Sequence, residues 1–166
     1  MDSPSPLPSP RASIKWPLQL AAAVLVGALV GMLAAMPQVA GYFRVGVQSL
    51  LAGLVLGVML IGVLTMARAA RIHWITPLLA AIVAVFAEHY WLYLTALRLR
   101  REALAKQPAA GLFRPGWAEE GFFSYMSSEA TSTALMWWSL DACLLAAAAV
   151  GIVVLSNYWQ STSDEG

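Results

Sequence analysis

The chain has few charged residues for its length. Only 11% of its 166 residues are Asp, Glu, Lys or Arg, whereas soluble domains contain about 25%. The formal net charge of +1 provides no basic surface for nucleic acid. Hydrophobic residues make up 60% of the chain, which is more than a soluble fold of this size can bury. The composition therefore predicts a one-domain integral membrane protein that contacts the lipid bilayer and no nucleic acid.

Cysteine and histidine are scarce as well. Cys143 is the only cysteine, which excludes a disulfide scaffold and a dithiol oxidoreductase. The only histidines, His73 and His89, lie sixteen residues apart on one predicted helix, so one chain cannot place two facing ligands on haem. Nucleotide-binding loops, serine elbows and zinc-protease motifs are absent from the sequence. We therefore expect no catalytic residue, no metal and no cofactor, and an enzyme is disfavoured.

Four apolar runs are long enough to cross a membrane. A helix of about 20 apolar residues spans the hydrocarbon core, and no segment alternates as the strands of a membrane barrel do. Pro37 is expected to end the first helix, and Thr76 and Pro77 to begin the third as cap and first helical residue. We predict an all-α, four-transmembrane-helix antiparallel bundle over residues 18–156, with spans at 18–36, 45–66, 77–97 and 134–156.

The segments outside the spans are mostly short. Residues 1–17 form a Pro/Ser-rich tail that is expected to be disordered, and residues 157–166 form a polar tail. Short connections predict that the first three helices are sequential antiparallel neighbours. The one long loop, residues 98–133, joins helices three and four. Helix three is expected to extend into water and break before Pro108, and a short amphipathic helix near Ala118–Ser128 to lie at the membrane surface.

Basic residues flank the predicted spans on both sides. Six lie on the side of the long loop and four on the side of the termini, which favours a cytoplasmic loop. The first span alone favours the opposite orientation, because Arg11 and Lys15 precede it and only Arg44 follows closely. Since bundles with an even number of spans commonly keep both ends inside, we expect both termini on the cytoplasmic side of a bacterial inner membrane.

Small residues recur at helical spacing in the spans. Glycines four residues apart make a flat groove that lets two helices approach closely. Such a groove serves either an oligomer interface or packing within one bundle, and four available spans favour the second. The predicted packing residues are Gly27, Gly31, Gly53, Gly57, Ala80 and Ala84.

Aromatic residues cluster near the predicted membrane interfaces. Amphipathic rings favour the headgroup region, so an aromatic belt accounts for most of them. A quinone or haem pocket is the alternative interpretation. The residues concerned are Trp74, Tyr90, Trp91, Trp137 and Trp138.

Three ionisable residues fall well inside the predicted spans. Glu88 and His89 lie in the third span and Asp141 in the fourth, at similar distances from the same end. Charges at this depth are costly, so such residues need partners. Glu88 and Asp141 are expected to share a proton, with His89 or Trp137 as donors. Structural hydrogen bonding between helices, contact with an arginine of a partner subunit, and proton or cation transport all remain open for this cluster.

The sequence thus favours a small non-catalytic membrane protein. Absent reaction motifs, short extramembrane segments and small-residue faces indicate an accessory, assembly or scaffold subunit of a larger complex. The expected partners are other membrane subunits or a second copy of the chain. The alternative is a proton- or cation-coupled transporter or channel that uses Glu88, His89 and Asp141.

Overall fold

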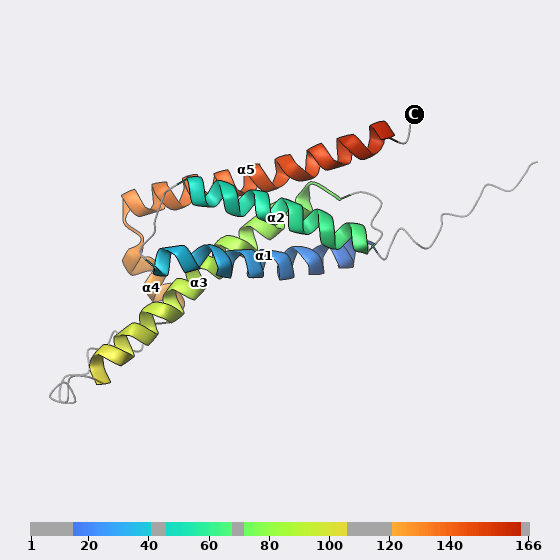
Figure 1. Cartoon of the computed structure of the whole chain (residues 1–166). Coiled ribbons are helices and arrows are strands. Elements are labelled where there is room, and N and C mark those ends of the chain that lie inside the picture. Colours follow the sequence, from blue (N-terminus) through green and yellow to red (C-terminus); the bar gives the residue numbers. More distant parts are fainter. Residues whose placement is uncertain (1–14, 41–45, 68–71, 106–120, 164–166) are drawn as a thin grey trace, which may run out of the picture.

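All the secondary structure that is described in this chain is helical (Figure 1). The computed structural model describes residues 15–40, 46–67, 72–105 and 121–163, and the predictions for the tail at 1–14 and the break before Pro108 lie outside them. The helices are α1 (Lys15–Val39), α2 (Val47–Met66), α3 (Ile75–Ala105), α4 (Phe122–Glu129) and α5 (Ser132–Ser163).

The long helices α1, α2, α3 and α5 are the four predicted from the apolar runs. Each is long and apolar enough to cross a membrane. The predicted helical class, with four candidate membrane-spanning helices, is therefore confirmed in the described part of the chain.

Several helix ends differ from the predicted ones. α1 begins at Lys15, so residues 15–17 of the tail that was predicted to be disordered are helical. α1 passes through Pro37 and ends at Val39, so the prediction that Pro37 ends it is wrong. A proline this close to the end of a helix disturbs only the last turns. α3 begins at Ile75, which places Thr76 inside the first turn, so the capping role assigned to Thr76 is wrong. α5 continues to Ser163, so much of the predicted polar tail is helical.

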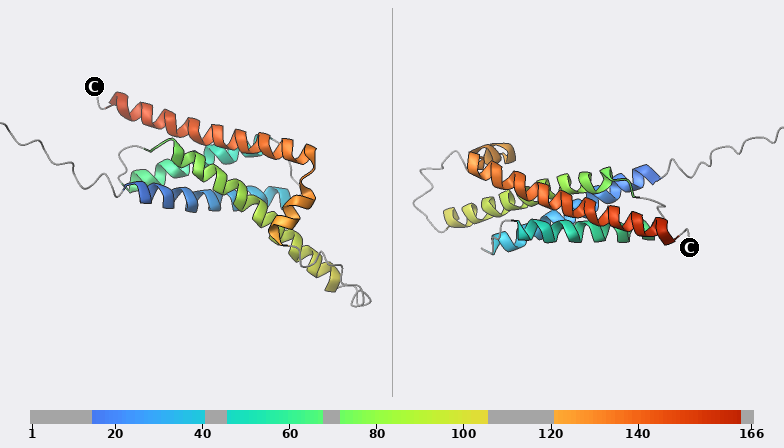
Figure 2. Two further views of the ribbon diagram at one scale, coloured as in Figure 1. Left: turned by 180° about the vertical axis from the view of Figure 1, so that it is seen from behind. Right: turned by 90° about the horizontal axis from the view of Figure 1, so that it is seen from above.

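The long loop contains the expected short helix, α4. It begins at Phe122, directly after the extended residue Gly121, and not near Ala118. α3 extends beyond residue 97 to Ala105, as predicted. Both views in Figure 2 show this extension leaving the bundle, and α4 packs against α3.

The long helices associate in two main pairs. α1 packs most extensively against α3, and α2 against α5. α2 and α3 also contact each other, but far less than the helices of either main pair. The reason is that the faces with small residues pack together between α1 and α3 and between α2 and α5, and neither of these pairs is consecutive in the chain.

Glycines of α1 allow α1 and α3 to approach each other closely. Gly27 lies against Ala80, where an added Cβ would come within 2.5 Å of the alanine carbonyl oxygen, and Gly31 lies against Ala84. The order 27–31 matches the order 80–84, so the two helices run in the same direction. Close backbone contact of this kind provides dispersion energy that lipid does not replace.

Glycines of α2 serve the second pair in the same way. Gly53 lies against Leu145 and Ala148, and a Cβ at Gly57 would lie 2.8 Å from that of Ile152. Again the residue numbers rise together along the two helices, so α2 and α5 run in the same direction. Both glycine pairs are thus used within the chain.

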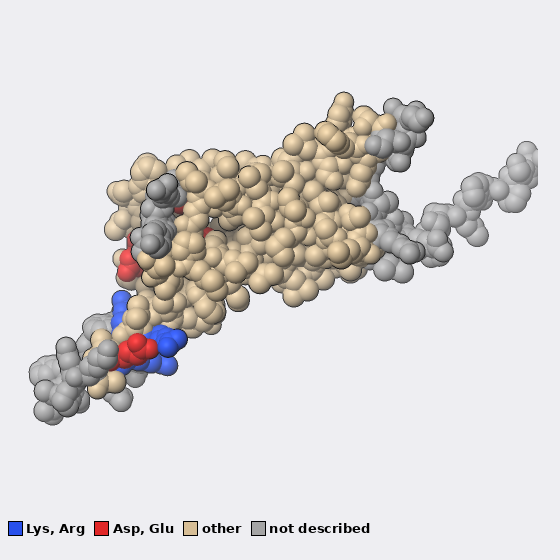
Figure 3. Space-filling view, in the orientation of Figure 1, with Lys and Arg blue, Asp and Glu red and all other residues tan. Residues whose placement is uncertain are grey.

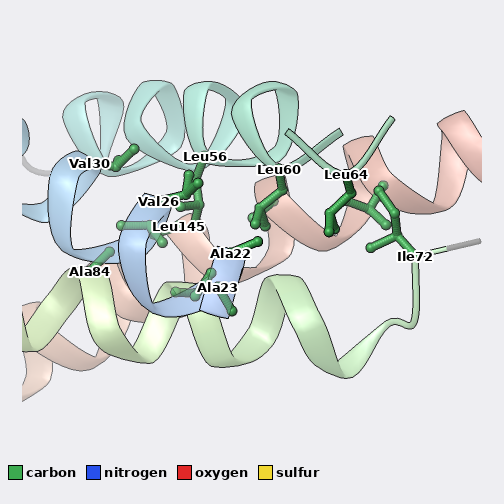
Figure 4. Packing of buried hydrophobic residues seen from close by; sticks show 14 residues of the cluster. Ala22, Ala23, Val26, Val30, Leu56, Leu60, Leu64, Ile72, Ala84 and Leu145 are labelled. Carbon is green, nitrogen blue, oxygen red and sulfur yellow. The ribbon is translucent and has the colours of Figure 1, made fainter. Parts of the chain in front are cut away.

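Leucines of α2 fill the space between the pairs (Figure 4). Leu56, Leu60 and Leu64 are fully buried, and the residues of α1 that face them, such as Ala22 and Val26, are small. The middle of the bundle is therefore an apolar packed core.

Side-chain amides close the end of the bundle where α1 and α3 begin and α5 ends. The Gln19 Oε1 atom accepts hydrogen bonds from the Thr76 hydroxyl (2.8 Å) and the His73 backbone N–H (3.1 Å). Asn157 donates to the Ile72 carbonyl (2.8 Å) and accepts from the Ile72 N–H (3.4 Å). The entry into α3 is therefore held between α1 and α5.

Candidate functional site: a carboxyl cavity at one end of the bundle

Glu88 ends a helical stripe that faces α1. Thr76, Ala80, Ala84 and Glu88 follow one another at four-residue spacing, and the first three all contact α1. The Glu88 carboxylate accepts a hydrogen bond from the side-chain amide of Gln38, near the end of α1. The direct partner of Glu88 is therefore an amide of α1 and not a group on α5.

Asp141 holds the start of α2. Its Oδ1 atom accepts a hydrogen bond from the backbone N–H of Gly46 at 2.9 Å. Gly46 has a φ of +83°, a conformation that side chains rarely adopt. The N–H groups at the start of a helix lack partners within the helix, so a carboxylate is well suited to this position. Asp141 thus provides, from another helix, the acceptor that the start of α2 needs.

His89 is oriented by its own helix and by α5. Its Nδ1 atom lies 2.8 Å from the Val85 carbonyl oxygen, which accepts only, so Nδ1 carries the proton. The ring meets Trp138 edge to face, with the centroids 5.0 Å apart. Of the two tryptophans at the start of α5, Trp138 and not Trp137 therefore belongs to the site. Nδ1 of His89 donates to this carbonyl, so it does not donate to either carboxyl group as predicted.

A cavity of about 220 Å³ brings the three predicted residues together. Glu88, His89 and Asp141 all line it, with Glu129 at the end of α4 as a third carboxyl group. Among the described residues that line the cavity there is no lysine or arginine. The arginines of the described segments lie on the α3 extension (Figure 3), where the charge of Arg100 reaches Tyr125. The described wall of the cavity is therefore acidic.

The cavity ends on the apolar core. Leu145 lines it and also belongs to the buried cluster that contains Leu56 and Leu60. The amide contacts of Gln19 and Asn157 lie at the opposite end of the bundle. Between the two polar ends, the described core residues are apolar, so the cavity belongs to one end only.

Known proteins do not assign a function to this cavity. No family model matches the chain, and no curated protein or solved structure matches it either. No group of three or more His, Cys, Asp or Glu residues in the described segments is arranged to hold a metal ion. The cavity provides mainly hydrogen-bond acceptors, beside the hydroxyl groups of Ser49 and Tyr125. Each carboxylate has about four lone-pair sites, and Glu88 and Asp141 each use one in the bonds described above. Such a site favours hydrogen-bond donors and positive charge.

Aromatic rings join α4 to α3 beside the cavity. The Phe122 ring lies 5.5 Å from Tyr90 and 5.7 Å from Tyr93, and Tyr125 lies 5.4 Å from Tyr93. Burial, and then the nearby Glu129 carboxylate, raise the pKa of the Tyr125 phenol. The phenol therefore stays protonated at neutral pH and remains a donor.

The other predicted aromatic residues lie apart from this cluster. Trp91 is partly buried, and Trp137 is exposed. Trp74 is exposed at the opposite end, where its ring lies 5.8 Å from that of His73. The structure thus divides the predicted aromatic set between both ends of the bundle.

Sequence reasoning missed the amides. Gln38 and Gln19 provide the hydrogen bonds to α3, Gln48 donates to the Ala34 carbonyl, and Asn157 holds Ile72. Their signal was present, because amides in or beside apolar runs need partners as carboxylates do. Unlike ionisable residues, however, amides do not stand out in an apolar run by charge.

Proposed function

We propose that the protein is a non-catalytic integral membrane protein: a four-helix bundle whose successive helices cross in opposite directions and which serves as an accessory subunit of a larger membrane complex. The observation that carries the proposal is the use of Glu88 and Asp141. Each accepts a hydrogen bond from another part of the bundle, Gln38 on α1 and Gly46 before α2. Polar residues used in this way stabilise helix association in a membrane.

The surface of α5 supports a role in a complex. Of the four candidate spans, the α5 span has the smallest share of residues buried inside the chain. Large apolar residues such as Leu140, Val154 and Leu155 are exposed along it. Because both glycine pairs are engaged internally, α5 offers the broadest free surface for another subunit, and lipid covers the remainder. We place this bundle in a bacterial inner membrane with both termini in the cytoplasm.

Native mass measurement in mild detergent tests the accessory role. The expected particle is a stable heteromer, and a Val154→Arg substitution on α5 releases the partner because a charge cannot be buried in an apolar interface without a counter-ion. Val58→Arg on α2, another exposed valine, serves as the matched control and leaves the complex intact. A clean homo-oligomer that is unaffected by Val154→Arg overturns the proposal.

A proton- or cation-coupled carrier is the second candidate, because Glu88, His89 and Asp141 line one cavity. The accessory role predicts no pH-dependent flux in liposomes. It also predicts that Glu88→Gln with Asp141→Asn preserves folding, since both replacements keep an acceptor oxygen. A flux that these substitutions abolish while folding is retained would establish the carrier in its place.

A further inference from the structure

An apolar groove lies between α3 and α5. It has a volume of about 300 Å³ and an almost wholly apolar surface. α3 contributes larger side chains and α5 contributes small ones, the main walls being Leu78, Ile82, Phe86, Ala142, Cys143 and Ala146. Pockets that hold small ligands have volumes of about 300–1,000 Å³, so the groove is large enough for part of a lipid. A partner helix, about 10–12 Å in diameter, is too wide for a space of this size.

The groove leads to the carboxyl cavity. A smaller apolar space of about 120 Å³ shares Val85 and Phe86 with the groove. The same space shares His89, Met126 and Trp138 with the carboxyl cavity. Ala142 lines both the groove and the cavity directly. The three spaces are therefore adjacent and form one site with an apolar part and an acidic part.

The acidic part suits a group that only donates hydrogen bonds. Glu88 and Asp141 each retain acceptor positions beyond their bonds to Gln38 and Gly46. His89 uses Nδ1–H on the Val85 carbonyl, so Nε2 is its remaining ring nitrogen, and in the neutral form of the ring Nε2 accepts a hydrogen bond. A primary ammonium group offers three donors and a positive charge and no acceptor, which complements this set.

We propose that the site binds an amphiphile, with a primary ammonium head in the carboxyl cavity and an aliphatic chain in the groove between α3 and α5. Charge complementarity selects the head, and the apolar lining of the groove selects the chain. The proposal goes beyond the accessory role and does not depend on it, since it requires only that the helices lie in a membrane. The ammonium belongs either to a single-chain amine or to a phospholipid such as phosphatidylethanolamine.

Native mass spectrometry of the purified full chain tests the proposal. The probes are phosphatidylethanolamine, phosphatidylcholine and phosphatidylglycerol with identical acyl chains, each added at the same concentration. Phosphatidylethanolamine is expected to be retained about tenfold better than the other two, the ratio that corresponds to one charge-assisted hydrogen bond. Hexadecylamine displaces it and hexadecanol does not. Binding of hexadecylamine by a chain that does not retain phosphatidylethanolamine identifies a single-chain amine as the ligand. Equal retention of all three lipids, with no effect of hexadecylamine, overturns the proposal.

Substitutions separate the two parts of the site. Glu88→Gln with Asp141→Asn replaces both acidic groups by neutral amides, so it is expected to abolish the preference for the ammonium lipid. Cys143→Phe fills the groove from an exposed position, so it reduces retention of every chain-bearing probe. Gly151 is also exposed on α5, and a Cβ added there meets nothing within 4 Å. Gly151→Ala is therefore the matched control and changes neither the lipid preference nor the retention of the probes. If retention in the Cys143→Phe chain equals that of the control, the groove is not the binding site.

Discussion

At the level of single residues, two glutamines hold α1 against α3. Gln19 binds Thr76 near the start of α3, and Gln38 binds Glu88 further along it. The oxygen of Gln19 serves two donors, and both Gln19 and Thr76 are almost completely buried. Leaving a buried donor without an acceptor costs more free energy than the hydrogen bond itself contributes. Gln19 is therefore expected to be the polar residue on which stability depends most at this end.

Replacing Gln19 tests this expectation. Gln19→Leu leaves the Thr76 hydroxyl and the His73 N–H without their acceptor, so the free energy of unfolding should fall by about 1–3 kcal/mol. Denaturation in mixed detergent micelles, followed by circular dichroism, measures the change. Thr76→Val removes one donor, so the double variant should lose less stability than the sum of the two single variants. Strict additivity would contradict a direct interaction between the two side chains.

At the level of elements, the glycine pairs determine which helices associate. Gly27 and Gly31 allow α3 to approach α1, and Gly53 and Gly57 allow α5 to approach α2. In each pair the helices run in the same direction. The sequence showed these flat faces through their four-residue spacing, but it did not show which face they meet, because each of the four spans carries small residues.

A methyl group at Gly31 should force its helix pair apart. A Cβ there would overlap the backbone of Ala84, which cannot move as a flexible side chain can. Gly31→Ala is expected to lower the free energy of unfolding by about 1–3 kcal/mol, as overpacking does. Gly62→Ala is the matched control, since a Cβ at Gly62 meets nothing within 4 Å. The control should be neutral or more stable by up to about 1 kcal/mol, through helix propensity. Equal effects of the two substitutions would rule out the close contact between α1 and α3.

At the level of the whole molecule, the two ends differ in chemistry. Amides close one end, around Gln19 and Asn157, and carboxylates line a cavity at the other, around Glu88 and Asp141. An apolar core separates them. A molecule of this kind presents its acidic cavity toward one side of the membrane only. The side it faces follows from the orientation of the helices.

Reporter fusions determine that orientation. With both termini in the cytoplasm, a reporter fused after residue 166 should be active inside and one inserted at residue 110 outside. Paired reporters that function only in the cytoplasm or only in the periplasm measure this. The reverse pattern would place the long loop and the carboxyl cavity in the cytoplasm, as the count of basic residues alone favours. Activity of both fusions on the same side would contradict four spans.

The sequence alone indicated that this protein lies in a lipid bilayer, and it determined the number of its long helices. Lipid cannot satisfy backbone polar groups, so each long apolar run forms a helix wherever its neighbours lie. It also singled out Glu88, His89 and Asp141, because ionisable residues stand out in an apolar run. Only the tertiary structure decided that Gln38 and Gly46 bind the two carboxylates and that α1 pairs with α3. These choices depend on the fit of faces far apart in the chain, which helical spacing within one segment does not specify.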